Sequence, residues 1–474
     1  MKASFSEYLA SVKGGLQYLL DRLLEEYDYV SILSTDAHGI RITASERVCS
    51  VSSDTLTSER GTVIRVFRDH LCSEYAFDAF DPAHPEEMLD EIRNALAAQM
   101  SVLAGMAVYE TGVPDDEPDT MLFEAECGIM PEDADTGRII ADLKEQAVRI
   151  SQQEEVIECR LQAESNHISK LFLSRNRDLS QSYVYSELKC LVVTAKGEQN
   201  RMAYAGRSSR GGCELFAECG DLADEVAAAA VELLSAERIE PGEYTIITSP
   251  EVSGLIAHEA FGHGVEMDMF VKKRALGADY INCRVGSDLV TMHEGALAAM
   301  SPASYAFDDE GTPAQDVIEI ENGILRTGIA DALSAKRLGV RPTGNGKRQN
   351  FEHKVYTRMT NTVFDPGKDT LEDMVASVDY GFYLEGMESG MEDPKHWGIQ
   401  CIVRSAREIR DGKFTGRLFA PVILTGYVPD LLGNISMVSA DQQVFGTGFC
   451  GKGYKEWVKV ADGGPCLKTV GRLG

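Results

Sequence analysis

Residues 245–268 read TIITSPEVSGLIAHEAFGHGVEMD, and the order of residue types in this stretch predicts a strand followed by a helix. Tyr244–Thr248 has the apolar and β-branched residues of a strand. Ser249 is a typical helix N-cap, and Pro250 suits the first helical position, where its missing N–H costs no hydrogen bond. We expect the helix to continue to the second histidine of the stretch.

Two histidines and a glutamate lie on this expected helix, in the pattern His258-Glu259-x-x-x-His263. The histidines are five positions apart, which places them about 140° apart around a regular α-helix. To face one ion, the helix must be underwound between them, as in a π-bulge, or must end near His263. Gly262 makes such a distortion easy.

The pattern does not establish a metal site by itself. With 9 His and 75 acidic residues in 474, it arises by chance in roughly one such chain in forty. In the competing interpretation, Glu259 and His263 form an ion pair on the helix surface while His258 is buried. The residues of the helix leave both interpretations open.

A catalytic zinc ion needs a third protein ligand and one open position. Glu266 and Asp268 are close in sequence, and any of the 11 cysteines could serve. Cys450 has the most suggestive context, GTGFCGKGY at 446–454, because a glycine-rich loop allows close approach to another element. Composition and spacing do not choose among these candidates.

Charge and cysteine usage narrow the functional class. The net charge of −29 repels polyanions, so direct binding to nucleic acid is not expected. The cysteines show no CxxC pair and no disulfide framework, which indicates reduced thiols and a cytoplasmic location. Because the first twenty residues lack a continuous apolar core and no later stretch is apolar enough to span a bilayer, we expect neither a signal peptide nor a membrane partner.

The N-terminal half is expected to mix helices with antiparallel strands. Apolar spacing predicts helices from Tyr8 to before Tyr27 and over 85–100. The runs 29–35, 36–43 and 47–53 predict a three-stranded meander. A near-heptad pattern from Thr136 to about Leu173 predicts one long helix, with a second meander at 186–206 packed on it.

A further alanine-rich helix is expected from Asp221 to about Glu237, and the domain boundary is placed before Pro241-Gly242. We therefore predict an α+β fold with two domains, an N-terminal one over 1–238 and a β-rich catalytic one over 239–474. Both should contain antiparallel sheets, because no regular βαβ alternation is present.

Several separated segments resemble the TldD/PmbA family of metallopeptidases, and specifically its TldD branch. They cover most of residues 240–474 and follow the family order: HEAFGHGVEMD at 258–268, DDEGTP at 308–313, RPTGNGKR at 341–348, RMTNT at 358–362, ISMVSAD at 435–441 and GFCGKG at 448–453. The PmbA branch lacks the histidine motif. Some members are also labelled modulators of DNA gyrase.

The resemblance implies that His258, His263 and Cys450 bind zinc and that Glu259 is the catalytic base. It also implies hydrolysis of unfolded peptides, bound extended along a sheet edge inside an enclosed dimer, with a second copy or a PmbA-like chain as the partner. GMESGMEDPKHWGIQ at 386–400 and YKEWVKV at 454–460 depart from the family pattern, so substrate preference and dimer partner are left open.

Other residues in these segments have less specific roles. Asn345, Arg358 and Asn361 are interpreted first as residues that shape loops, with direct contact to substrate as the alternative. An oxyanion-stabilising role for one of three further histidines is left open, and each is more often structural: His293, His353 and His396. The rival function is a non-catalytic, peptide-binding or regulatory member of the family.

Overall fold

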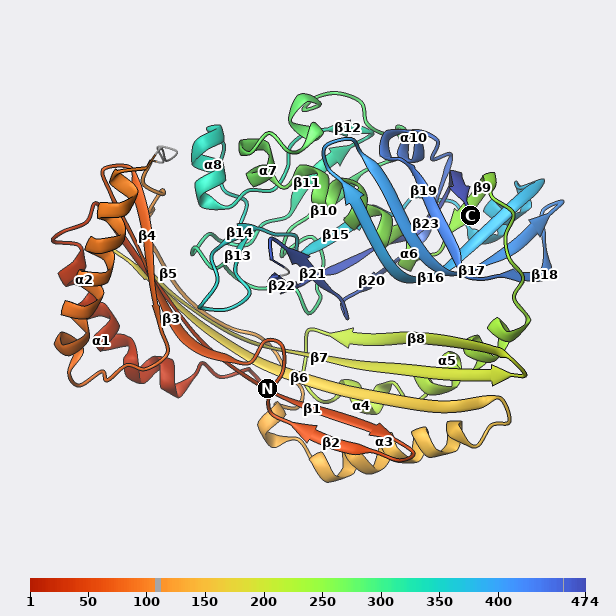
Figure 1. Ribbon diagram of the computed structural model, residues 1–474, viewed down its shortest axis with the longest axis horizontal. Helices are drawn as coiled ribbons and strands as arrows, with labels where there is room; N and C mark the ends of the chain where they lie inside the picture. Colours follow the sequence, from red (N-terminus) through yellow and green to blue (C-terminus); the bar gives the residue numbers. More distant parts are fainter. Residues whose placement is uncertain (107–111, 455) are drawn as a thin grey trace.

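The computed structural model describes residues 1–106, 112–454 and 456–474. It has an α+β fold built on two large, mainly antiparallel sheets, as predicted (Figure 1). One sheet is formed by β1–β8 and the other by β9–β12, β15–β20 and β23. Among the described residues, no helix combines the length and apolar character needed to cross a bilayer.

The N-terminal sheet has eight strands, in which β4-β3-β1-β6-β7-β5 are neighbours, β2 pairs with β1, and β8 pairs with β7. Its strands are β1 (Tyr29–Ser45), β2 (Cys49–Ser52), β3 (Glu59–Arg68), β4 (Leu71–Phe77), β5 (Asp119–Glu124), β6 (Val156–Ser174), β7 (Arg177–Lys196) and β8 (Gln199–Ser209). The accompanying helices are α1 (Glu7–Leu23), α2 (Pro85–Ala104), η1 (Pro131–Asp133), α3 (Thr136–Ser151), α4 (Leu215–Glu218), α5 (Leu222–Glu232) and η2 (Leu233–Ser235).

Two predictions for this half are wrong. The helix expected from Thr136 to about Leu173 ends at Ser151, and β6 follows it as a central strand paired with β1 and β7. Alternating burial of Cys159, Leu161 and Ala163 suits a strand that packs one face on a core.

The first meander also differs from its prediction. Its first two expected strands form the single strand β1, because β1 pairs with β6 without interruption from Ser31 to Ser45. The predictions of α1, α2, the β7–β8 hairpin and the alanine-rich α5 are confirmed.

The C-terminal sheet follows the order β12-β11-β10-β15-β23-β19-β17-β16-β9, with β18 and β20 at its side. Its strands are β9 (Gly242–Thr248), β10 (Met292–Glu294), β11 (Val317–Glu321), β12 (Ile324–Leu325), β15 (Asn361–Phe364), β16 (Tyr380–Asp393), β17 (Gly398–Arg410), β18 (Lys413–Phe419), β19 (Val422–Tyr427), β20 (Met437–Phe445) and β23 (Ala461–Leu473). Two small hairpins flank it: β13 (Gly346–Lys347) with β14 (Tyr356–Thr357), and β21 (Phe449–Lys452) with β22 (Glu456–Lys459).

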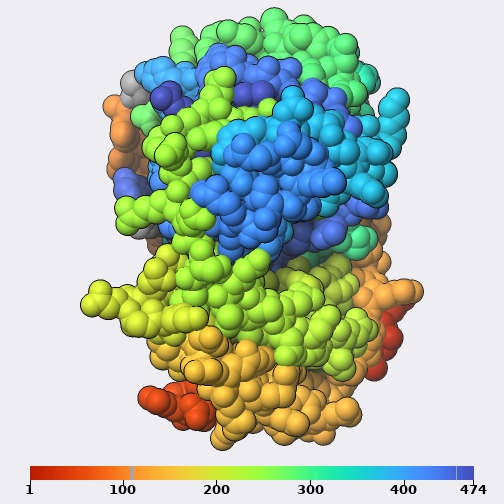
Figure 2. Space-filling view, turned by 90° about the vertical axis from the view of Figure 1, so that its right-hand side faces the viewer, coloured from red at the N-terminus to blue at the C-terminus, as the bar shows by residue number. Residues whose placement is uncertain are grey.

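Helices in this half are short and lie between the strands. They are α6 (Pro250–Ala257), η3 (His258–Gly262), η4 (His263–Val265), α7 (Met267–Val271), η5 (Leu276–Asp279), α8 (Ala332–Leu338), α9 (Leu371–Ala376) and α10 (Val428–Gly433). The largest apolar cluster joins α6 to the sheet through residues such as Ile256, Phe382 and Leu424. Figure 2 shows residues of the C-terminal half, green to blue, stacked on residues of the N-terminal half, yellow-green to orange.

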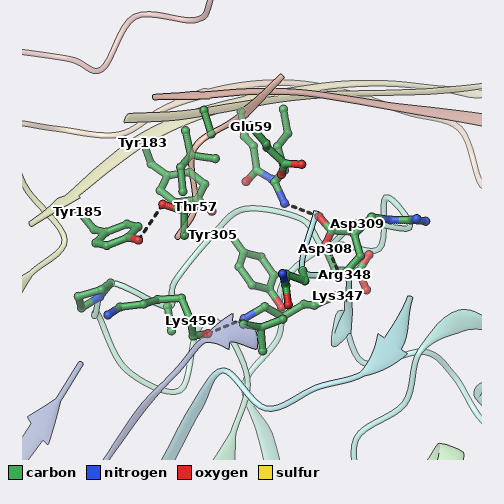
Figure 3. Close-up of a pocket in the computed structure, with 18 of the residues that line it drawn as sticks. Thr57, Glu59, Tyr183, Tyr185, Tyr305, Asp308, Asp309, Lys347, Arg348 and Lys459 are labelled. Carbon is green, nitrogen blue, oxygen red and sulfur yellow. Dashed lines mark hydrogen bonds and ion pairs between the residues drawn. The ribbon is translucent and has the colours of Figure 1, made fainter. Parts of the chain in front are cut away.

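Buried ion pairs connect the two halves. Lys459 Nζ on β22 lies 2.8 Å from Glu187 Oε2 on β7, and Lys170 of β6 pairs with Asp309. A cavity of about 70 Å³ lies among these groups (Figure 3). In it, Lys347 Nζ donates to the Lys459 carbonyl at 2.7 Å.

Burial in this cavity opposes the charge of Lys347. Burial lowers the pKa of Lys347 to about 7, from a usual value of 10.5. Because the folded-state pKa lies below the unfolded one, the unfolded chain binds more protons between these values. The free energy of unfolding should therefore rise with pH through that window.

We predict that Lys347→Met removes this dependence. The unfolding free energy of the wild type should rise relative to that of the variant by roughly 3 kcal/mol between pH 7 and 10, measured by urea denaturation. Lys368→Met, at an exposed position, controls for loss of a lysine as such. A difference between wild type and Lys347→Met that stays constant with pH would contradict the prediction.

Candidate metal centre and cleft

The helix that carries the two histidines changes its winding where they occur. Ser249 Oγ accepts a hydrogen bond from the Val252 N–H, which caps α6 as predicted. At η3 the chain forms a π-helical turn, in which the His263 N–H donates to the His258 carbonyl five residues earlier. The extra residue in this turn brings both imidazoles to one side, and their ring centroids lie 5.1 Å apart.

The β21–β22 hairpin brings Cys450 to the same point. Its Sγ lies 3.4 Å from His263 Nε2. One ligand atom from each of His258, His263 and Cys450 falls within 4.8 Å of the other two. The structure thus brings together all three residues considered as metal ligands, although 187 positions separate Cys450 from His263.

Glu266 and Asp268, the alternative third ligands, have another arrangement. Glu266 Oε2 lies 3.2 Å from His263 Nδ1, so this carboxylate orients the ring whose Nε2 faces Cys450. Lys452 Nζ lies 3.0 Å from Glu266 and 2.7 Å from Asp268. Glu266 therefore contacts the ligand His263 directly, and Asp268 is linked to Glu266 through Lys452.

The donor set fits a zinc ion. Imidazole nitrogen and thiolate sulfur are the common ligands of zinc, and three of them leave one position open. His258 Nδ1 is buried without a hydrogen-bond partner among the described residues. Burial opposes the thiolate of Cys450, but the two imidazoles outweigh it and hold the pKa of Cys450 well below its usual value.

Glu259 lines the same cleft as the cluster, and its side chain packs against the backbone of β16. The residue it meets there is Gly390: a Cβ added at this glycine would lie 2.5 Å from Glu259 Cγ. Glu259 is only 8% exposed. The position of its carboxylate thus depends on the absence of a side chain at 390.

The cluster opens into a cleft of about 870 Å³. One wall comes from the tip of the β16–β17 hairpin and the other from α7 and the β21–β22 hairpin; the lining includes Tyr204, Met269, Lys272, Arg274, Tyr356, Met387–Glu392, Pro394, Gly448–Gly453, Trp457 and Asp462. β9 pairs with β16 only over Gly381–Leu384. Beyond that point, one edge of β16 has no partner strand among the described residues.

Sequence reasoning missed several polar residues of this cleft. Burial raises the pKa of Glu392 to about 9, and its Oε1 is buried without a partner among the described residues. Burial also raises the pKa of Asp462 to about 7. The family-divergent segment at 386–400 was the available signal for Glu392, and the GFCGKG motif was the signal for Lys452. Asp462 had none.

Asn345, Arg358 and Asn361 are buried and shape loops, as interpreted from the sequence. Arg358 donates to the carbonyls of Cys450, at 2.5 Å, and Glu456, at 2.9 Å. It therefore anchors both strands of the hairpin that carries the thiol. The Asn345 amide donates to Glu294 and to the Arg358 carbonyl.

His293, His353 and His396 are not among the residues that line the cleft. His293 Nδ1 contacts Asp316 at 2.7 Å, and His396 Nδ1 contacts Asp393 at 2.6 Å. His353 Nδ1 contacts Asn350. Each has a local structural partner, so an oxyanion-stabilising role gains no support.

In sequence, the chain resembles known metalloproteases. Residues 241–465 match the model of the PmbA/TldA metallopeptidase C-terminal domain. A metalloprotease of Methanocaldococcus jannaschii is 32% identical over 250 residues, 53% of this chain and 54% of that protein. A zinc metalloprotease TldD homolog of Saccharolobus solfataricus is 31% identical over 237 residues, 48% of this chain and 50% of that protein.

These matches have a limited extent, since the chain spans about half the length of the curated relatives it matches. The fold likeness is broader. The crystal structure of TldE from Thermococcus kodakarensis superposes with a TM-score of 0.75, covering 97% of this chain and all of that one at 19% identity. Residues 241–465 thus belong with the C-terminal domains of PmbA/TldA metallopeptidases, and the chain as a whole has the fold of TldE.

Proposed function

We propose that the chain is a zinc-dependent peptidase whose metal is held by His258, His263 and Cys450. The convergence of these three donors from two distant segments supports this most strongly. A relative named as a zinc metalloprotease agrees with the choice of metal. Glu259, next to the first ligand and in the same cleft, is proposed as the catalytic base.

In this proposal, a bound zinc ion supplies Lewis-acid activation of the scissile carbonyl and of water. Glu259 accepts a proton from the water and then donates it to the leaving amine. Glu266 keeps the His263 ring in its orientation, and Lys452 balances the charge of Glu266. The buried position of the cluster restricts access of bulk water to the reacting groups.

The proposed substrates are unfolded or extended peptides. The segment Met387–Glu392 of β16 lines the cleft and offers one unpaired edge in the described part of the sheet. An extended peptide can add to such an edge by main-chain hydrogen bonds. A folded protein presents few segments that are free to do so.

The proposal extends to the domain division, the cellular location and the partner chain. The division into domains 1–238 and 239–474 follows the separation of β1–β8 from β9–β23 between the two large sheets. A cytoplasmic location fits the eleven free thiols. The family resemblance suggests a second copy or a PmbA-like chain as partner, which light scattering of the chain alone and in mixtures can test.

Glu259→Gln should retain zinc and lose peptide hydrolysis by about 10³-fold, because the amide cannot accept the water proton. Zinc content is measured by elemental analysis and cleavage with an unstructured reporter peptide. Glu388→Gln, which changes another carboxylate of the cleft, serves as the control.

A chelator should abolish cleavage by the wild type, and added zinc should restore it. Cleavage by Glu259→Gln at the wild-type rate would refute the role of the base. Peptide binding without any cleavage by the zinc-loaded wild type would favour the non-catalytic alternative.

Gly390→Ala should displace the Glu259 side chain and lower the turnover rate by about 10²-fold while zinc remains bound. Gly398→Ala lies in the same hairpin, where an added Cβ has no neighbour within 4 Å, and should leave turnover unchanged. Equal effects of the two substitutions would show that Gly390 does not position the base.

Lys452→Met should leave Glu266 and Asp268 as buried charges that lack their shared partner. We expect a loss of about 3–5 kcal/mol in the free energy of unfolding of the metal-free chain. Zinc affinity should fall by about 10-fold or more, because the carboxylate that orients His263 is disturbed.

Lys272→Met is the matched control, since Lys272 pairs with Asp268 at 2.8 Å but is 42% exposed. It should cost at most about 1 kcal/mol. Calorimetric zinc titration and urea denaturation separate the two variants. Similar losses in both would contradict a special role for Lys452.

A further inference from the structure

A second cluster of metal-binding side chains lies on the N-terminal sheet. His38 on β1 and His167 on β6 are directly opposite each other in the strand register, so their side chains share one face. Glu132, on the short turn η1, reaches both. Its Oε1 lies 2.6 Å from His38 Nε2 and 2.8 Å from His167 Nδ1.

One tautomer of His167 that fits its hydrogen bonds leaves the nitrogen facing Glu132 without a proton. Ser182 Oγ donates its single proton to the Ser4 carbonyl at 3.0 Å, which can only accept. With its proton on that carbonyl, Ser182 accepts from His167 Nε2–H at 2.8 Å, and Ser169 Oγ at 3.0 Å is its third partner. In the neutral ring, Nδ1 then presents a lone pair toward the Glu132 carboxylate.

In that tautomer, the His167 Nδ1 lone pair and the Glu132 carboxylate repel each other unless a positive charge lies between or beside them. Either a second ring proton on His167 or a bound metal ion can supply this charge. The bond from His167 Nε2–H to Ser182 is the kind of outer contact that fixes the orientation of metal-binding histidines. Because His167 is only 5% exposed, its ring is held in place before any ligand arrives.

We propose that His38, Glu132 and His167 form a second binding site for a divalent transition metal ion, and that this ion is zinc. One ligand atom from each residue lies within 4.8 Å of the other two. Two imidazoles and a carboxylate are a common zinc ligand set, and the remaining position is open to solvent. The site connects β1, β6 and η1 and is independent of the proposed peptidase centre.

The site is accessible and can adjust to an ion. The side chains of His38 and Glu132 are 49% and 44% exposed, which gives an ion a direct path. Ligand atoms around tetrahedral zinc are about 3.3 Å apart, so Glu132 must withdraw by roughly 0.6 Å. A side chain on a three-residue turn can make this movement while the two strands stay in register.

The test counts zinc ions bound to the full chain by equilibrium dialysis at micromolar free zinc, followed by elemental analysis. The wild type should bind two per chain, and both Glu132→Gln and His263→Ala should bind one. Asp133→Asn removes the same charge from the adjacent exposed position and should still bind two. Cobalt in His263→Ala should lack the thiolate charge-transfer band that a site with Cys450 shows.

The outcomes separate this inference from the proposed peptidase centre. If His263→Ala binds no zinc, or Glu132→Gln binds as much as the wild type, the second site is refuted and Glu132 bridges protonated histidines only. If Glu132→Gln loses all zinc while His263→Ala loses none, the second site stands and the peptidase centre fails. Circular dichroism of each variant shows whether a loss reflects unfolding.

Discussion

The ion pairs of Lys452 fix the distance between the two separate parts of the candidate metal centre. This lysine is two residues beyond Cys450 on β21, so strand alternation places both side chains on the same face. Its ammonium pairs with Glu266, which in turn orients His263. One buried carboxylate therefore sets both the angle of an imidazole and the approach of the hairpin with the thiol. Because the side chain of Lys452 is only 11% exposed, solvent does little to weaken this link.

The local part of this centre could be predicted from sequence, because it depends on residues that are neighbours in the chain. The N-cap at Ser249 and the underwound turn after His258 both follow from spacing and residue type.

Gly262 was expected to make the underwound turn easy through its backbone flexibility, and this expectation needs correction. Its φ of −59° is ordinary for a helix, so flexibility is not what the position requires. A Cβ there would lie 2.2 Å from Met359 Sδ, and glycine instead allows the π turn to approach the segment that anchors the hairpin.

The parts that sequence did not predict depend on strand register between distant segments. The apolar residues after Ser151 fit a heptad, but Leu161 and its neighbours also fit the period of two that the sheet selects once β1 and β7 pair on either side. His38 and His167 meet for the same reason, since a single register across β1 and β6 places them opposite each other. Neither spacing nor composition contains that register. The choice of Cys450 among eleven cysteines likewise came from family resemblance and not from the residues themselves.

The candidate metal centre and one wall of its cleft are held in place by different contacts. Residues that would select a peptide can therefore change separately from those that would cleave it. Buried contacts of Lys452 and Arg358 hold the hairpin that carries Cys450. The opposite wall, Met387–Glu392, belongs to the end of the β16–β17 hairpin, where exposed side chains such as Met391 carry few such constraints. Residues 386–400 are also one of the two segments in which the sequence departs from the family pattern, the other being 454–460. Changes there can alter which peptides enter without moving the histidines and the thiol, except at Gly390, where any side chain would press on Glu259. That glycine is the point at which the variable wall and the proposed chemistry are coupled.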